Sequence, residues 1–173
     1  MGTNGVTGAV AEVEMVVDLP VDEVWRLVTD VGRMAQGSPE CVFAAWRPDQ
    51  GEVPRAGAVF DARNEYADGF VAAVECVVTE AARPSVFEWV VLDDDRDVTR
   101  PGSIWRYELE PDDGGGTRLR QRFTHGPGLT GLREFVQDHP DRGKAALDGR
   151  LAQLRDNMAA TLRATLDPMG STR

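Results

Sequence analysis

The chain has 173 residues, of which 42% are hydrophobic and 28% are charged, as is ordinary for a globular protein. At this length we expect one domain that buries about 70% of the surface its unfolded chain exposes, enough for a core without disulfides or metals. Aspartate and glutamate outnumber lysine and arginine by 29 to 19, a net charge of −10. Nucleic-acid binding is therefore not expected, because its affinity comes largely from basic side chains that neutralise phosphates.

The cysteines and histidines are too few and too scattered to indicate a metal site. Cys41 and Cys76 stand in apolar surroundings and fit either two buried thiols or a disulfide between them. The histidines are His125 and His139, so neither a metal nor another cofactor is expected. Residues 1–8 lack the basic and apolar segments of a signal peptide, and no apolar run is long enough to span a membrane. The sequence favours a cytoplasmic protein that does not insert into membranes.

The first elements are predicted to be a strand and two short helical segments. Residues 9–19 alternate between apolar and acidic side chains, which is the pattern of a half-buried strand. Pro20 is well placed to open an amphipathic helix over residues 20–29, because its missing N–H is not needed in the first turn. Residues 30–39 are predicted as a second short helix or a loop.

Six further strands follow, joined by short turns and not by helices. They are predicted at residues 40–47, 58–66, 70–80, 86–92, 103–110 and 117–125. Neighbours joined in this way should pair antiparallel, as a meander. The period then changes: residues 129–138 suit a short helix, and the leucines of residues 141–166 recur at steps of three or four, as on one face of a long amphipathic helix.

These elements predict an α+β fold with a seven-stranded antiparallel curved sheet. The long C-terminal helix has the length and the apolar stripe to cover the apolar face of the sheet. A strongly curved sheet wrapped around one helix rarely fills completely, so we expect a cavity between them. The domain is predicted over residues 9–167, with flexible ends at residues 1–8 and 168–173.

Because side chains alternate along a strand, parity predicts which residues face that cavity. The inward set combines aromatic residues with a few polar ones, and a buried amide without a partner costs about 1–3 kcal/mol. Each inward polar group must therefore bond to a neighbour, to water or to a ligand. The candidate ligand-binding residues are Phe60, Asn64, Tyr66, Trp89, Trp105, Tyr107, Gln121, Phe123 and His125, with Leu154 and Met158 from the helix.

One alternative to this interpretation stays open at the level of sequence, because the aromatic side chains suit plain core packing as well as a ligand-binding wall.

The arginines of the last predicted strand are not part of the inward set. Arg118, Arg120 and Arg122 point outward by the same parity, and they are expected to pair with acidic residues across the sheet. No arginine is clearly inward on the predicted strands.

Several short strings resemble one known superfamily. Leu19-Pro20-Val21-Asp22-Glu23-Val24-Trp25, with Thr29-Asp30, resembles the strand-to-helix opening of the SRPBCC (START/birch-pollen-allergen-like) superfamily. Strings similar to its bacterial polyketide cyclase/dehydrase-like branch are Ser38-Pro39-Glu40, Phe60-x-Ala62-x-Asn64, Trp105-Arg106-Tyr107-Glu108-Leu109 and Leu151-x-x-Leu154-x-x-Asn157-Met158. The resemblance implies a helix-grip fold, in which the sheet grips the C-terminal helix around a hydrophobic ligand cavity.

For function, this resemblance implies a protein that binds a small hydrophobic, aromatic or polyketide-like molecule, as a monomer or homodimer. The alternative is a cofactor-independent cyclase/dehydratase, with Tyr107 or His125 as proton donor and Asn64 or Gln121 holding a carbonyl. Cyclases of the superfamily are expected to use arginine and tyrosine in the cavity, and here Tyr66 and Tyr107 are predicted inward. A third reading is an interaction module with a filled core.

Overall fold

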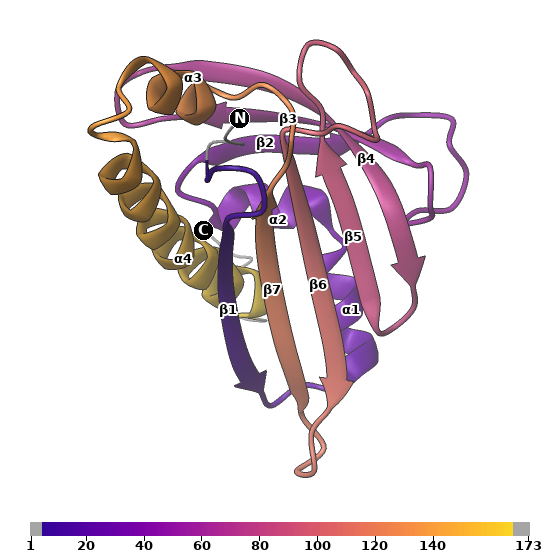
Figure 1. Cartoon of the computed structure of the whole chain (residues 1–173). Coiled ribbons are helices and arrows are strands. Elements are labelled where there is room, and N and C mark those ends of the chain that lie inside the picture. Colours follow the sequence, from indigo (N-terminus) through magenta and orange to yellow (C-terminus); the bar gives the residue numbers. More distant parts are fainter. Residues whose placement is uncertain (1–4, 168–173) are drawn as a thin grey trace.

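The computed structural model describes residues 5–167, so residues 1–4 and the predicted flexible end at residues 168–173 lie outside the described part. Figure 1 shows a strongly curved antiparallel sheet with the long helix α4 crossing its concave side. Helices α1 and α2 lie behind the sheet in this view, and α3 lies at the end of the molecule where β2 and β3 run. The predicted α+β helix-grip fold is confirmed.

The strands follow the predicted ranges to within about three residues at each end. They are β1 (Val10–Val17), β2 (Cys41–Trp46), β3 (Val59–Glu65), β4 (Val71–Ala82), β5 (Val86–Val91), β6 (Ser103–Pro111) and β7 (Thr117–His125). Their order in the single seven-stranded sheet is β1-β7-β6-β5-β4-β3-β2. Strands β2 to β7 thus form the predicted meander, and β1 pairs antiparallel with β7 to extend the sheet.

Two of the four helices of the described chain begin at a capping side chain. The four helices are α1 (Val21–Val28), α2 (Val31–Gly37), α3 (Gly131–Asp138) and α4 (Gly143–Leu166). Asp30 caps α2, and Thr130 caps α3, each by accepting a hydrogen bond from a backbone N–H in the first turn. The segment predicted as a helix or a loop is thus a helix. No helix in residues 5–167 has both the length and the apolar character needed to cross a bilayer.

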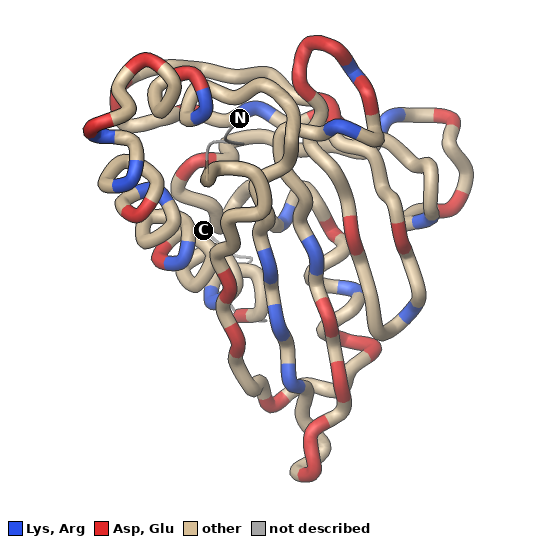
Figure 2. Tube along the Cα trace, viewed as in Figure 1, with Lys and Arg blue, Asp and Glu red and all other residues tan. Residues whose placement is uncertain are grey.

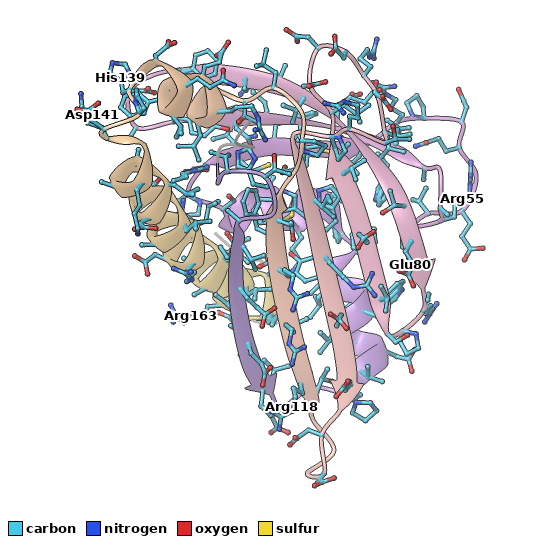
Figure 3. All side chains as sticks on the ribbon, in the orientation of Figure 1. Arg55, Glu80, Arg118, His139, Asp141 and Arg163 are labelled. Carbon is cyan, nitrogen blue, oxygen red and sulfur yellow. The ribbon has the colours of Figure 1, made fainter. Side chains whose placement is uncertain are left out.

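Opposite charges line up across the outer face of the sheet. Arg118 lies 2.9 Å from a carboxylate oxygen of Glu14, and Arg122 lies 2.7 Å from one of Glu12. Figure 2 shows the basic row along β7 between acidic rows on β1 and β6, and Figure 3 shows Arg118 near the turn at one end of β7. The predicted outward pairing is confirmed. Exposed pairs of this kind are each worth only about 0–1 kcal/mol, so the core must supply the stability.

The core occupies the end of the curved sheet that α1 and the second half of α4 cover. Phe87, Tyr107, Leu119 and Leu162 are at most 1% exposed there. Trp25 of α1 meets the ring of Phe87 edge-on, with 6.2 Å between the ring centroids. We call these five residues and their neighbours the filled half of the fold.

The apolar stripe of α4 is buried along only part of its length. Leu154, Met158, Leu162 and Leu166 are buried, whereas Leu151 is half-buried. Leu147, one turn closer to the start of the helix, is also half-buried. The first half of α4 therefore leaves part of the concave face of the sheet uncovered.

The start of the described chain is packed against the sheet. Val6 is fully buried, and the backbone N–H of Gly8 donates to the carbonyl oxygen of His125 at 2.8 Å. Residues 1–8 were predicted to be flexible, but residues 5–8, the part of this segment that the structure describes, pack against the sheet. A single apolar side chain in a polar, glycine-rich run was too weak a signal to predict this contact.

The two halves of α4 should differ in their contribution to stability. Leu162→Ala is expected to lower the free energy of unfolding by about 2–5 kcal/mol, because it leaves a cavity among fully buried side chains. Leu147→Ala, at a half-buried position on the same stripe, is the matched control and should cost clearly less. Urea unfolding followed by tryptophan fluorescence measures both; equal losses would contradict the assignment of the filled half.

Candidate functional site

A cavity of about 950 Å³ lies between the concave face of the sheet and the middle of α4, from Arg150 to Thr161. Its walls come from β2 to β7 and from the helices α2, α3 and α4. The volume falls within the range of about 300–1,000 Å³ that is usual for small-molecule sites. The predicted cavity is therefore present, on the side of the fold that α4 leaves uncovered.

One wall of this cavity is aromatic. Phe60, Trp89, Trp105 and Phe123 all line it, and we call these four residues the aromatic wall. The indoles of Trp89 and Trp105 stack with 6.1 Å between ring centroids, and Phe123 meets Trp105 edge-on at 5.0 Å. Because neighbouring rings hold each other in place, the wall presents a rigid apolar surface.

Gln121 and Tyr107 face each other across β7 and β6 next to this wall. Gln121 is 3% exposed and lines the cavity, and its Nε2 donates to the Tyr107 hydroxyl oxygen at 3.1 Å. Tyr107 is 1% exposed and is not among the lining residues of the cavity. Burial raises the pKa of Tyr107 well above its usual range, so its hydroxyl stays protonated at neutral pH.

His125 lines the cavity at the end of β7, with both ring nitrogens engaged. Nδ1 lies 3.2 Å from the carbonyl oxygen of Gly126, and Nε2 lies 3.1 Å from Oγ1 of Thr130. A carbonyl only accepts, so Nδ1 carries the proton and Nε2 accepts from the threonine hydroxyl. His125 thus holds Thr130, the residue that caps α3.

In the turn after His125, there is no room for a side chain at Gly126. A Cβ atom there would lie 2.1 Å from the carbonyl oxygen of Pro101. The backbone of this turn therefore packs directly on the loop between β5 and β6. This close approach fixes the direction in which the chain leaves β7 toward α3.

The opposite wall carries an ion pair that parity on the strands did not reveal. Arg150 of α4 lines the cavity and makes two hydrogen bonds to the carboxylate of Glu40, at 2.5 and 2.9 Å. Its guanidinium also lies over the Tyr66 ring, 5.6 Å from the centroid. Burial alone would lower the pKa of Arg150, but the hydrogen bonds and charge of Glu40 outweigh it and raise the pKa.

Arg150 corrects the expectation that no arginine faces the cavity. That expectation considered the strands alone, and Arg150 belongs to the helix. The signal was present in the sequence, because Arg150 stands three residues after Leu147 and four before Leu154, on the flank of the apolar stripe. Gln153, Asn157 and Thr161 of α4 also line the cavity and were missed in the same way.

The structure brings the predicted site residues together, with one exception. Tyr107 lies behind Gln121, whereas the other predicted residues line the cavity: Phe60, Asn64, Tyr66, Trp89, Trp105, Gln121, Phe123, His125, Leu154 and Met158. Tyr66 is half-buried at the opening, where burial raises its pKa. Whether these residues bind a ligand remains a prediction.

Neither cysteine is suited to nucleophilic chemistry. Cys41 and Cys76 are free thiols that line the cavity, and burial raises the pKa of both. The reactive form is the thiolate, which a raised pKa disfavours at neutral pH. Within residues 5–167, no group of three or more histidine, cysteine, aspartate or glutamate side chains is placed to hold a metal ion.

The burial of His125 generates a prediction about pH. Burial lowers its pKa below the ordinary value of 6.5, so the unfolded chain takes up a proton at higher pH than the folded chain does. The free energy of unfolding should therefore fall as pH drops below about 6.5 and level off below the folded pKa. NMR titration of the His125 ring should give a midpoint below 6.5.

A variant isolates this effect from the titration of carboxylates. His125→Gln cannot take up the proton, so its stability relative to the wild type should rise as the pH is lowered from 7 to 5. Urea unfolding at each pH measures the difference. A His125 midpoint at or above 6.5, or a relative stability of the variant that does not rise as the pH is lowered, would contradict the assigned environment.

The comparisons with known proteins agree with this geometry. Residues 9–162 match the family described as polyketide cyclase / dehydrase and lipid transport. A search of curated proteins returned no match. Among solved structures, the Polyketide_cyc-like protein Cgl2372 of Corynebacterium glutamicum is 24% identical, with 95% of this chain and 97% of that chain covered and a TM-score of 0.60.

Two aromatase/cyclases share the fold at lower identity. The Zhui aromatase/cyclase from Streptomyces sp. R1128 is 20% identical over 91% of each chain, with a TM-score of 0.64. The di-domain aromatase/cyclase StfQ of the steffimycin biosynthetic pathway is 15% identical, with a TM-score of 0.69. The match covers 94% of this chain and 50% of StfQ, so the chain spans half of that di-domain protein. Because the family model matches most of this chain, the chain belongs to the polyketide cyclase / dehydrase and lipid transport family.

Proposed function

We propose that this protein binds a small hydrophobic molecule, aromatic or polyketide-like, in the cavity between the sheet and α4. The observation that carries the proposal is the cavity of about 950 Å³ with the aromatic wall along it, whose rings belong to the core and also line the cavity. Aromatic side chains that line such a space can stack on a flat apolar ligand. The same open space argues against an interaction module with a filled core.

The few polar groups around the cavity fit the recognition of such a ligand. Gln121 lies beside the aromatic wall, and Arg150 with Glu40 lies on the opposite side, next to Tyr66. Sparse polar groups of this kind orient a ligand within an apolar site. Two of the similar structures are aromatase/cyclases, which supports an aromatic polyketide as the class of ligand.

The arrangement of proton donors favours binding without catalysis. Each ring nitrogen of His125 already has a partner, and Tyr107 lies behind Gln121 with a raised pKa. A general acid must reach the reacting atom and have a pKa near the working pH. Neither predicted donor meets both conditions in this structure, so we propose a carrier and not an enzyme.

The second candidate function is a cyclase/dehydratase, and Arg150 is the observation in its favour. Its guanidinium carries a fixed positive charge at the cavity wall, next to the phenol ring of Tyr66. A cation can polarise a ketone and stabilise an enolate as it forms. Ring closure of a poly-ketone needs these two effects and the loss of water.

Binding should be detectable with a hydroxylated naphthoquinone or anthraquinone as the probe. Such a probe should quench tryptophan fluorescence, because Trp89 and Trp105 line the cavity, and should raise the melting temperature by stabilising the native state. Ala72→Trp, which places a large ring in the cavity, should abolish both effects.

Val71→Trp is the matched control, because Val71 neighbours Ala72 on β4 but is 50% exposed and does not line the cavity. It should leave binding intact. The proposal fails if a broad panel of aromatic probes gives no response, or if the two tryptophan variants affect binding equally.

Carrier and cyclase differ in what happens to the bound molecule. The protein is expected to bind a linear poly-ketone mimic and return it unchanged, with no cyclised product of lower mass by one water above the protein-free rate. Mass spectrometry of the extracted mixture measures this. A product that forms faster with the protein, and is lost with Arg150→Gln while binding persists, would establish the cyclase instead.

A further inference from the structure

Gln121, a residue of the cavity lining, has one hydrogen-bonding end bound to the protein and one without a protein partner among the described residues. Its Nε2 donates to Tyr107 at 3.1 Å. Its Oε1 is a buried acceptor with no hydrogen-bond partner among residues 5–167. The whole side chain is 3% exposed and belongs to the cavity lining. An acceptor taken out of water in this way keeps its full desolvation cost until a donor reaches it.

The surroundings of this oxygen determine what kind of donor can reach it. Gln121 and Phe123 stand two residues apart on the same face of β7, about 7 Å along the strand. Trp105 lies directly across from Phe123 on the neighbouring strand. A flat ring system resting against Trp105 and Phe123 therefore has its edge next to Gln121, at roughly the length of two fused six-membered rings.

We propose that Gln121 recognises a hydroxyl group on the ring edge of the ligand, and that the hydroxyl donates to Oε1. This inference rests on the proposed function and adds the chemical class: a hydroxylated aromatic such as a phenol, and not its ketone counterpart. It reverses the role expected from the sequence, in which Gln121 holds a carbonyl. A carbonyl needs a donor, and one of the two amide N–H groups of Gln121 is engaged by Tyr107, whereas Oε1 has no partner at all among the described residues.

Tyr107 is the positioning residue in this arrangement. It is 1% exposed and pairs with Gln121 in the register of β6 and β7, so its hydroxyl holds the amide in one orientation. A hydrogen bond to a buried acceptor discriminates strongly between a ligand that carries a donor and an analogue that lacks it, because the analogue leaves the acceptor unpaired. The same geometry disfavours a ligand that brings a second acceptor to Oε1.

The test compares three naphthalene probes on the full chain by isothermal titration calorimetry. The probes are 2-naphthol, which carries a donor; 2-methylnaphthalene, which has neither donor nor acceptor; and 2-acetylnaphthalene, which carries only an acceptor. Gln121→Met keeps the volume of the side chain and removes the amide. This substitution is expected to lower the affinity for 2-naphthol about tenfold and to change the affinity for the other two probes less than about twofold.

Thr124→Val is the matched control, because Thr124 lies three residues after Gln121 on β7 and does not line the cavity. It should leave the ratio of 2-naphthol to 2-methylnaphthalene affinity unchanged. Circular dichroism checks that both variants fold. If Gln121→Met does not fold, the wild type still decides: the side-chain carbonyl carbon of Gln121 should shift in the NMR spectrum with 2-naphthol and not with 2-methylnaphthalene.

Each other outcome overturns the inference in a recognisable way. Equal losses for 2-naphthol and 2-methylnaphthalene would show that Gln121 only shapes the cavity or that water occupies Oε1. A selective loss for 2-acetylnaphthalene would show that the amide donates to a carbonyl. In these cases aromatic binding itself stands. If none of the probes binds the wild type, both this inference and the proposed function fail.

Discussion

One helix has to cover a sheet whose concave face is larger than the helix. The apolar stripe of α4 is buried from Leu154 to Leu166, and its last leucines, Leu162 and Leu166, close the filled half of the fold, in the same core cluster as Phe87 and Leu119. Toward its start, α4 turns half-buried leucines and polar side chains to the sheet, and α3 contributes no buried residue. The space left uncovered is the cavity of about 950 Å³.

The polar groups of the cavity follow from the same mismatch. Where the sheet is covered, Tyr107 finds a protein partner in Gln121, although the hydroxyl of Thr165 on α4 is buried without a partner among the described residues. Where it is uncovered, Arg150 needs Glu40, and Oε1 of Gln121 keeps no protein partner among the described residues. His125 stands between these cases, since it lines the cavity but uses both ring nitrogens to hold the chain that leads to α3.

The sequence predicted the fold well because its signals are local. Apolar alternation and short turns place β3 and β7 within two residues of their observed ends, and the leucine spacing from Leu147 to Leu166 indicates α4. Parity also predicted Phe60, Trp89 and Phe123 to point inward, and all three are buried. The inward or outward orientation of a strand residue thus follows from the alternation of side chains along the strand.

The details of the site depend on contacts between elements, which no local pattern contains. The position of Arg150 beside the apolar stripe is a local signal, but its pairing with Glu40 is not, because the two lie 110 residues apart in sequence. The direction of the Gln121 amide depends on the cross-strand register that brings Tyr107 opposite to it. The burial of Val6 depends on how the first turn meets β7. These three contacts turn an inventory of inward residues into a site with defined donors and acceptors.

The central claim is that the uncovered half of the fold, and not its outer face, receives an aromatic molecule. Assigned ¹H–¹⁵N and methyl NMR spectra, recorded as 2-naphthol is added, test this claim directly. The account predicts shifts at Ala62, Val74, Leu154 and Met158 around the cavity, and little change at Leu119 and Leu162 in the filled half. Shifts confined to the outer face of the sheet, or no shifts at concentrations that saturate ordinary aromatic sites, would contradict it.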